Sequence, residues 1–223
     1  MKETDIGEAV VRHLESEHWD VYQEVQIYQG GPVADIVALC GPLVMVVECK
    51  TSMSMQLMGQ AWDWRRHCNL TQIAVPRPKS RGAGKAFAES VLNERGIGLL
   101  EVGRWRGDGV TVNLRPKLRR TADTSDLRAA LTPEHKTAAK AGTSGGGHMT
   151  PFKRTILALR RHVAKHDGCT LKSAFTAITH HYSSYASGRA RLIDLIKRGV
   201  ISDLRIETVR SGPGRGTFIW RVA

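Results

Sequence analysis

The chain has 223 residues, of which 41% are hydrophobic and 24% are charged, and its formal net charge is +12. These values are ordinary for a folded protein and exclude a wholly disordered chain. No apolar run approaches the roughly 20 residues of a membrane-spanning helix, and the N-terminus lacks the basic and apolar regions of a secretory signal. We therefore expect a cytoplasmic protein with no membrane partner, in which the four sparse cysteines are reduced thiols.

The helices and strands of residues 1–114 are predicted from hydrophobic periodicity. Gly41 and Pro42 mark a hairpin turn, Ser54 marks a helix start and Gly96 a helix stop. The resulting order, α-β-β-β-α-β-α-β-β, predicts an α/β domain with a mixed central sheet. Helices are expected at 4–18, 54–67 and 83–95, and strands at 19–28, 33–39, 43–47, 70–75, 97–102 and 110–114.

The periodic pattern stops in residues 116–150, which contain few large apolar residues and a run of three glycines. Such a composition is typical of a linker. We therefore predict a domain over 1–115, a linker over 116–150 and a second domain over 151–223.

The second domain is predicted to contain three helices followed by a β-hairpin. The helices begin at 151, 171 and 185, and the two strands, 204–210 and 217–222, are joined by a glycine-rich tip. This is the order of a small winged-helix domain, in which the third helix enters the DNA major groove and the hairpin contacts phosphates or the minor groove.

The charge is unevenly distributed along the chain. Residues 1–50 contain nine acidic and three basic residues, whereas 51–150 carry a net charge of +8 and 151–223 a net charge of +10. A basic protein favours a polyanion such as nucleic acid as its partner. An acidic region within it suits an enzyme that binds phosphates with Lys and Arg and a cation with carboxylates. Chance segregation of surface charge would give the same pattern, so charge alone leaves both interpretations open.

Three ionisable residues are predicted to meet at the end of two apolar strands. If the hairpin turns symmetrically at Gly41 and Pro42, Asp35 lies directly opposite Glu48. Glu48 and Lys50 are two apart on one strand, so their side chains share a face, and Cys49 between them points into the core. The two carboxylates and the Cys49 backbone carbonyl form an all-oxygen site suited to Mg²⁺ or Mn²⁺. A surface ion pair between Glu48 and Lys50 is the structural alternative.

Ala34-Asp35 together with Glu48-Cys49-Lys50 resembles the signature of the PD-(D/E)XK nuclease superfamily, which includes type II restriction enzymes and archaeal Holliday-junction resolvases. The resemblance extends to the order of elements over residues 4–114, roughly half the chain, but Ala34 stands where the signature has Pro. It implies a restriction-endonuclease-like α-β-β-β-α-β core and Mg²⁺-dependent phosphodiester hydrolysis that leaves a 5′-phosphate. Asp35 and Glu48 would be metal ligands and Lys50 the catalytic lysine.

Two further positions are candidates for the same site. Glu8 lies on the first predicted helix, and several members of the superfamily place a helix-borne glutamate near the metal; a solvated helix acid is the alternative. Gln60 followed by Trp64 resembles the Q-x-x-x-Y element of exonuclease-type members, with Trp in place of Tyr. Gln60, and with less support Gln56 one turn earlier, could bind a phosphate or a metal-bound water; an ordinary helix surface is the alternative.

Basic residues in both domains are candidates for DNA binding. Those of the first domain precede or open a helix, where backbone N–H groups favour phosphate. Those of the second lie on the predicted third helix and around the hairpin tip. A cluster of Trp62, Trp64, Arg65 and Arg66 could stack on bases, although we expect Trp62 at least to lie in the core. The DNA-binding candidates are Arg77, Lys79, Arg81, Lys85, Ser187, Arg189, Arg191, Arg210 and Arg215.

These observations predict a Mg²⁺-dependent DNA endonuclease in which Mn²⁺ can replace Mg²⁺ and the second domain binds DNA. A single site per chain makes double-strand cleavage easiest for a homodimer. Two alternatives stay open: a non-catalytic DNA-binding regulator built on a nuclease-like scaffold, and a nuclease directed at RNA.

Overall fold

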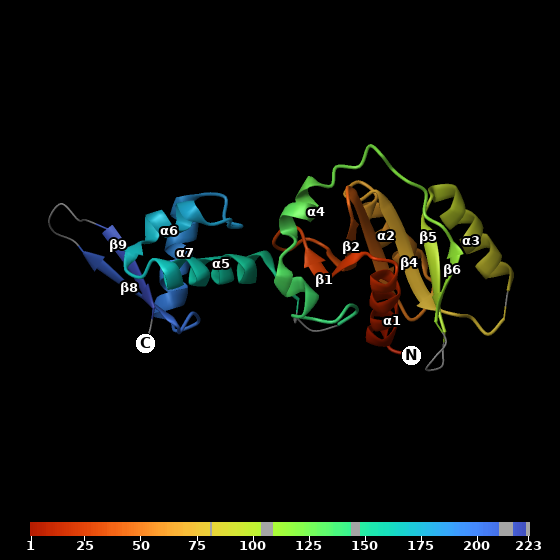
Figure 1. The fold of residues 1–223 in the computed structure, drawn as a ribbon, viewed down its shortest axis with the longest axis horizontal. Helices are drawn as coiled ribbons and strands as arrows, with labels where there is room; N and C mark the ends of the chain where they lie inside the picture. Colours follow the sequence, from red (N-terminus) through yellow and green to blue (C-terminus); the bar gives the residue numbers. More distant parts are fainter. Residues whose placement is uncertain (81, 104–108, 144–147, 210–215, 222–223) are drawn as a thin grey trace. The chain divides into compact units, whose positions relative to one another are not determined.

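The computed structural model of the chain describes residues 1–80, 82–103, 109–143, 148–209 and 216–221. They belong to two compact units, Met1–Met149 and Thr150–Ala223, which are considered separately (Figure 1). None of the helices in the described ranges is long and apolar enough to cross a membrane.

Within its described part, the first unit forms a six-stranded sheet in the order β1-β2-β3-β4-β5-β6 (Figure 1). The β3–β4 and β4–β5 pairs are parallel and the other pairs are antiparallel, so the mixed α/β sheet and the order of elements predicted for residues 1–114 are confirmed. The strands are β1 (Asp20–Gln26), β2 (Val33–Cys40), β3 (Leu43–Cys49), β4 (Leu70–Pro76), β5 (Gly98–Val102) and β6 (Val110–Leu114). The helices are α1 (Glu3–Ser16), α2 (Met55–Trp64), α3 (Ala83–Arg95) and α4 (Ser125–Ala130), with a short 3₁₀ helix η1 (Pro133–Lys136).

Local sequence signals determine where α2 begins and where α3 ends. The hydroxyl of Ser54 accepts a hydrogen bond from the backbone N–H of Leu57 at 3.1 Å, which caps the start of α2. Gly96 has φ +67°, and its N–H bonds to the Asn93 carbonyl at the end of α3. A glycine adopts this left-handed conformation without steric cost, so α3 ends where the sequence predicts.

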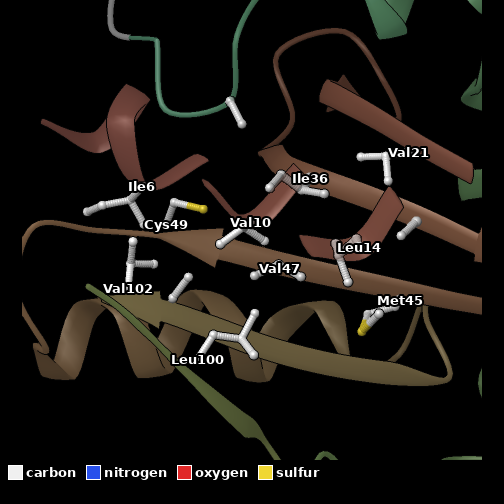
Figure 2. Packing of buried hydrophobic residues seen from close by; sticks show 13 residues of the cluster. Ile6, Val10, Leu14, Val21, Ile36, Met45, Val47, Cys49, Leu100 and Val102 are labelled. Carbon is white, nitrogen blue, oxygen red and sulfur yellow. The ribbon is translucent and has the colours of Figure 1, made fainter. Parts of the chain in front are cut away.

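The two faces of the sheet are covered by different helices. On one face, Ile6, Val10 and Leu14 of α1 pack against a cluster that includes Ile36 and Val47 (Figure 2). On the other face, Leu57 and Ala61 of α2 and Leu92 of α3 are buried. They pack against strand residues of β4 and β5, namely Ile73, Val75 and Leu99. The sheet is therefore the middle layer of three, and both of its faces are apolar because both are covered.

The prediction of a linker over 116–150 is wrong for much of that segment. Leu127 and Ala130 of α4 are buried with Val25 in a second cluster on the sheet, His135 of η1 is 0% exposed, and Ala141 lies in the cluster beneath α1. A helix of six residues that buries one leucine and one alanine gives too little periodicity to be seen in the sequence. This segment is therefore an integral part of the first unit.

In its described residues, the second unit contains three helices and a three-stranded antiparallel sheet in the order β7-β9-β8. Its second helix, α6, was expected to span 171–180 but ends at Ala177, because Ile178 is extended with φ −116° and ψ 154°. The two-residue strand β7 is too short to be predicted. The elements are α5 (Pro151–Lys165), β7 (Cys169–Thr170), α6 (Leu171–Ala177), α7 (Tyr185–Lys197), β8 (Leu204–Val209) and β9 (Gly216–Arg221).

Candidate metal and catalytic site

Asp35 and Glu48 meet at the open end of the β2–β3 hairpin. Ile36 pairs with Val47 in the antiparallel register, so the next position along the hairpin brings Asp35 opposite Glu48, as predicted. Asp35 Oδ2 accepts a 2.7 Å hydrogen bond from the backbone N–H of Cys49. The Cys49 side chain is fully buried in the apolar cluster beneath α1 (Figure 2), so it points into the core as predicted.

Lys50 follows the last residue of β3 and is held there by the neighbouring strand and by α1. Its backbone N–H bonds to the Ala74 carbonyl at 3.0 Å, and its Nζ lies 3.0 Å from Glu3 Oε2. The side chain is still 35% exposed, so an incoming substrate can reach the ammonium group. Glu3 was not predicted, because an acid in the first turn of a helix is an ordinary helix-dipole feature.

The helix-borne acid that reaches this group is Glu3 and not Glu8. The Glu8 carboxylate lies 2.8 Å from Arg12 Nη1 and 3.5 Å from Lys140 Nζ, and its side chain is 51% exposed. Glu8 therefore matches the alternative of a solvated helix acid.

A third carboxylate, Glu24 of β1, lies beside Asp35 and was missed by the sequence analysis. Gln23 pairs with Ile36 and Val25 with Ala34, which brings Glu24 opposite Asp35. Glu24 has φ +53°, and its Oε1 accepts hydrogen bonds from the N–H groups of Gly142 and Thr143 at 2.7 and 3.2 Å. The signal that could have found it is the register of the first hairpin, but its loop offers no symmetric turn from which to count.

Burial governs the protonation of these carboxyls. It raises the pKa of Glu24 to about 7, and the neighbouring Asp35 charge adds to the effect. Burial also raises the pKa of Asp35, opposed by the Cys49 N–H, by Lys50 and by a hydrogen bond with Glu48. The pKa of Glu48, which is 3% exposed, is raised well above its usual value by burial and then by the charge of Asp35.

Lys50 supplies the positive charge of the group. Burial lowers the pKa of Lys50, but the hydrogen bond that Lys50 donates to Glu3 and the negative charges of Asp35 and Glu48 outweigh burial, so the net effect is to raise the pKa. One ammonium thus faces several carboxyls, and its positive charge only partly opposes the burial that raises the pKa of Glu24, Asp35 and Glu48.

The α2 helix contributes two side chains near Glu48. Trp64, 3% exposed, donates a 2.6 Å hydrogen bond from Nε1 to Glu48 Oε1. Gln60 lies one turn earlier, and its Oε1 is buried without a hydrogen-bond partner among the described residues. Gln56, another turn earlier, is exposed. Of the two glutamines, Gln60 is therefore the one with an unused acceptor on the helix that reaches Glu48.

The chemistry of this group fits a magnesium ion. The bonds from Cys49 and Trp64 occupy one oxygen of Asp35 and one of Glu48, and the two carboxyls are close enough to hydrogen-bond to each other. A cation can replace the proton between two such carboxyls. In the described part of the chain, no group of three or more His, Cys, Asp or Glu side chains is arranged to hold a metal ion. Mg²⁺ is commonly bound by one or two carboxylates, with waters and substrate phosphates as its other ligands.

The basic residues predicted to bind DNA in the first unit are not equivalent. Lys79 is exposed, and Arg77 is exposed while its guanidinium donates to Thr111 Oγ1. Lys85 was expected to face phosphate, but its Nζ lies 2.5 Å from Glu101 Oε1 and 3.4 Å from Glu89 Oε1, and its side chain is 14% exposed. Lys85 therefore points inward and pairs with the buried Glu101 of β5. Arg81 lies outside the described residues.

In the second unit, α7 carries the predicted contacts at its start. The Ser187 N–H bonds to the Ser184 hydroxyl, which caps the helix. Arg189 donates to Thr217 Oγ1 of β9 at 3.1 Å, whereas Arg191 is exposed and lies 3.3 Å from Asp194. Both arginines are exposed, and each already has one polar partner within the second unit. Arg210 and Arg215 lie outside the described residues.

Comparison with known proteins gives little beyond this geometry. No family model matches the chain, and no curated protein matches it. Among solved structures, it is similar to the SPO1766 protein of unknown function from Silicibacter pomeroyi, with 17% identity and a TM-score of 0.42. The similarity covers 56% of this chain and 77% of that one.

Proposed function

We propose that the first unit is a Mg²⁺-dependent endonuclease that hydrolyses phosphodiester bonds in DNA, and that Mn²⁺ can replace Mg²⁺. The observation that carries the proposal is the meeting of Asp35, Glu48 and Lys50 at the open end of one hairpin. The resemblance to PD-(D/E)XK nucleases supports it, since these residues occupy the positions of that signature.

Each residue then has a distinct task. Asp35, Glu48 and the Cys49 carbonyl would hold Mg²⁺, which when bound would polarise a phosphodiester oxygen and lower the pKa of the attacking water. Lys50 keeps its proton, so its ammonium can orient that water or stabilise negative charge that develops on the phosphate. Trp64 fixes the orientation of the Glu48 carboxylate by its hydrogen bond. Gln60 offers an acceptor for a metal-bound water.

The second unit would bring DNA to this site. Three helices followed by an antiparallel sheet, with +10 of net charge in residues 151–223, support a winged-helix module whose helix α7 contacts DNA. Two chains would supply the two sites that a double-strand cut needs, so we include a homodimer in the proposal. The four free cysteines suit a reducing cytoplasm.

The test combines cleavage and binding. The purified chain with Mg²⁺ or Mn²⁺ should cut linear, nicked, forked or four-way DNA, and matched RNA substrates would identify an RNA-directed nuclease. Asp35→Asn, Glu48→Gln and Lys50→Ala should each abolish cleavage and keep DNA binding, whereas the exposed control Glu94→Gln should cleave as the parent does. A Glu48→Gln variant that cleaves like the parent would overturn the mechanism.

A non-catalytic DNA-binding regulator is the second candidate. It is favoured by the burial of Glu48, which is 3% exposed and already bonded to Trp64. Calorimetric titration with Mn²⁺ separates the two candidates. An enzyme should show a binding site that disappears in Asp35→Asn, and a regulator should show none.

A further inference from the structure

The first unit carries a second cluster of charged residues, away from the carboxyls, at the end of α2. Trp62 was expected in the core, but it is 43% exposed, whereas Trp64, two residues later, is 3% exposed. Two positions correspond to about half a turn of helix, so these tryptophans face opposite sides. Trp64 contacts Glu48, and Trp62 points outward from the same helix.

Four arginines surround Trp62, and they come from three separate segments. The guanidinium carbons of Arg65 and Arg95 lie 5.1 and 5.2 Å from the centroid of the Trp62 ring, within the range of cation–π attraction. Arg66 and Arg119 line a pocket of about 400 Å³ with Trp62, Arg65 and Asp63. We call Trp62, Arg65, Arg66, Arg95 and Arg119 the arginine pocket.

Among the described residues that line the pocket, one acid, Asp63, stands against three arginines. Burial lowers the pKa of Arg65, and the positive charges of Arg119 and Arg95 lower it further. Arg119 Nε is buried without a hydrogen-bond partner in the part of the chain that the structure describes. Asp63 supplies the acid in the lining of the pocket. Gathered guanidinium groups, one of which has a buried donor without a partner among the described residues, fit an anion with several acceptor oxygens, and arginine forks match phosphate in geometry.

We propose that the arginine pocket binds the phosphate backbone of the nucleic acid on which the unit acts. This inference rests on the proposed function, and it adds a contact surface on the outer side of the helix whose inner side orients Glu48. Trp62 holds Arg65 and Arg95 by its ring, so their N–H groups are directed before the ligand arrives. The contacts are to phosphate, so they should strengthen binding without selecting a base sequence.

The test is the salt dependence of DNA binding by the full chain, measured by fluorescence anisotropy with a labelled duplex and EDTA to prevent cleavage. The logarithm of the binding constant falls with the logarithm of salt concentration by about 0.9 for each phosphate neutralised. The double variant Arg65→Gln/Arg119→Gln should therefore reduce the slope by about 1.8. The matched control Arg12→Gln/Lys140→Gln removes the same charge from the same unit, at residues paired with Glu8, and should leave the slope within about 0.5 of the parent.

A second variant removes the aromatic ring without changing the charge. Trp62→Leu should weaken binding several-fold at low salt, because Arg65 and Arg95 lose the ring that orders them. Equal slopes for the two double variants would overturn the arginine pocket. Failure of the proposed function gives a different result: the parent chain would show no metal-dependent cleavage, while the difference in slope between the two double variants would remain.

Discussion

Replacing Glu24 by Gln should make the protein more stable at alkaline pH, although Glu24 is buried and hydrogen-bonded. The pKa of Glu24 is raised to about 7 in the folded protein, against 4.5 for an ordinary glutamate. Between these values the folded chain holds a proton that the unfolded chain has released. Stability therefore falls as pH rises through this window, and the loss is complete near pH 8.

The size of the effect follows from the two pKa values. At roughly 1.4 kcal/mol per pH unit, they correspond to about 3 kcal/mol, and solvent screening at the end of the sheet reduces this to about 2 kcal/mol. A glutamine has nearly the shape of the protonated acid, and its Oε1 can still accept from Gly142 and Thr143. Glu24→Gln should therefore match the parent near pH 4 and exceed its free energy of unfolding by about 2 kcal/mol near pH 8.

Urea unfolding followed by tryptophan fluorescence at both pH values measures the difference. Glu8→Gln is the matched control, since this exposed acid is paired with Arg12 at the surface and its loss should cost less than about 1 kcal/mol. If Glu24→Gln is no more stable than the parent near pH 8, the assignment of a buried and electrostatically costly carboxyl is wrong. Saturating Mg²⁺ should narrow the difference, because a cation beside Asp35 offsets the negative charge.

Four further substitutions test other parts of the structure by the same unfolding assay. Trp64→Phe removes the donor to buried Glu48 and should cost about 1–3 kcal/mol, whereas an unchanged stability would argue against that hydrogen bond. Gly7→Ala would place a Cβ 2.6 Å from the Ala141 carbonyl oxygen and should cost about 1–3 kcal/mol; Gly59→Ala in α2, where a Cβ meets nothing within 4 Å, should stabilise by about 0.5–1 kcal/mol. Lys85→Met leaves Glu101 without its cation and should cost about 3 kcal/mol near neutral pH, and a neutral result would place Lys85 on the surface.

The sequence predicted the strands and their pairing well where turn and helix-capping residues mark the ends of the elements. The Gly41-Pro42 turn fixed the β2–β3 register, and with it the meeting of Asp35 and Glu48. Such signals act locally, through backbone conformations that few residues can adopt, so they can be recognised without knowing the tertiary structure.

The incorrect sequence predictions share one physical cause. The burial and partners of these residues are determined by contacts with residues that are distant in sequence. The phase of α2 decides that Trp64 is buried and Trp62 exposed, and two tryptophans at i and i+2 do not reveal it. Lys85 turns inward because Glu101 is buried in β5. The 116–150 segment is ordered in part because Leu127 and Ala130 pack against an apolar cluster on the sheet. The local sequence does not predict this long-range packing.

The carboxyls of Glu24, Asp35 and Glu48 are costly to the fold, and this cost bears on the choice between enzyme and regulator. Burial raises the pKa of all three, so at neutral pH the folded protein gives up stability to keep them at one place. A DNA-binding scaffold gains nothing from this arrangement, and amides in place of the acids would remove the cost while preserving most of the hydrogen bonds. In an enzyme, by contrast, the ionised carboxylates of Asp35 and Glu48 would supply the negative charge that holds a catalytic cation. Under the proposed function, a bound cation would offset this cost, and the stability of the amide variants measured with and without Mg²⁺ decides between enzyme and regulator.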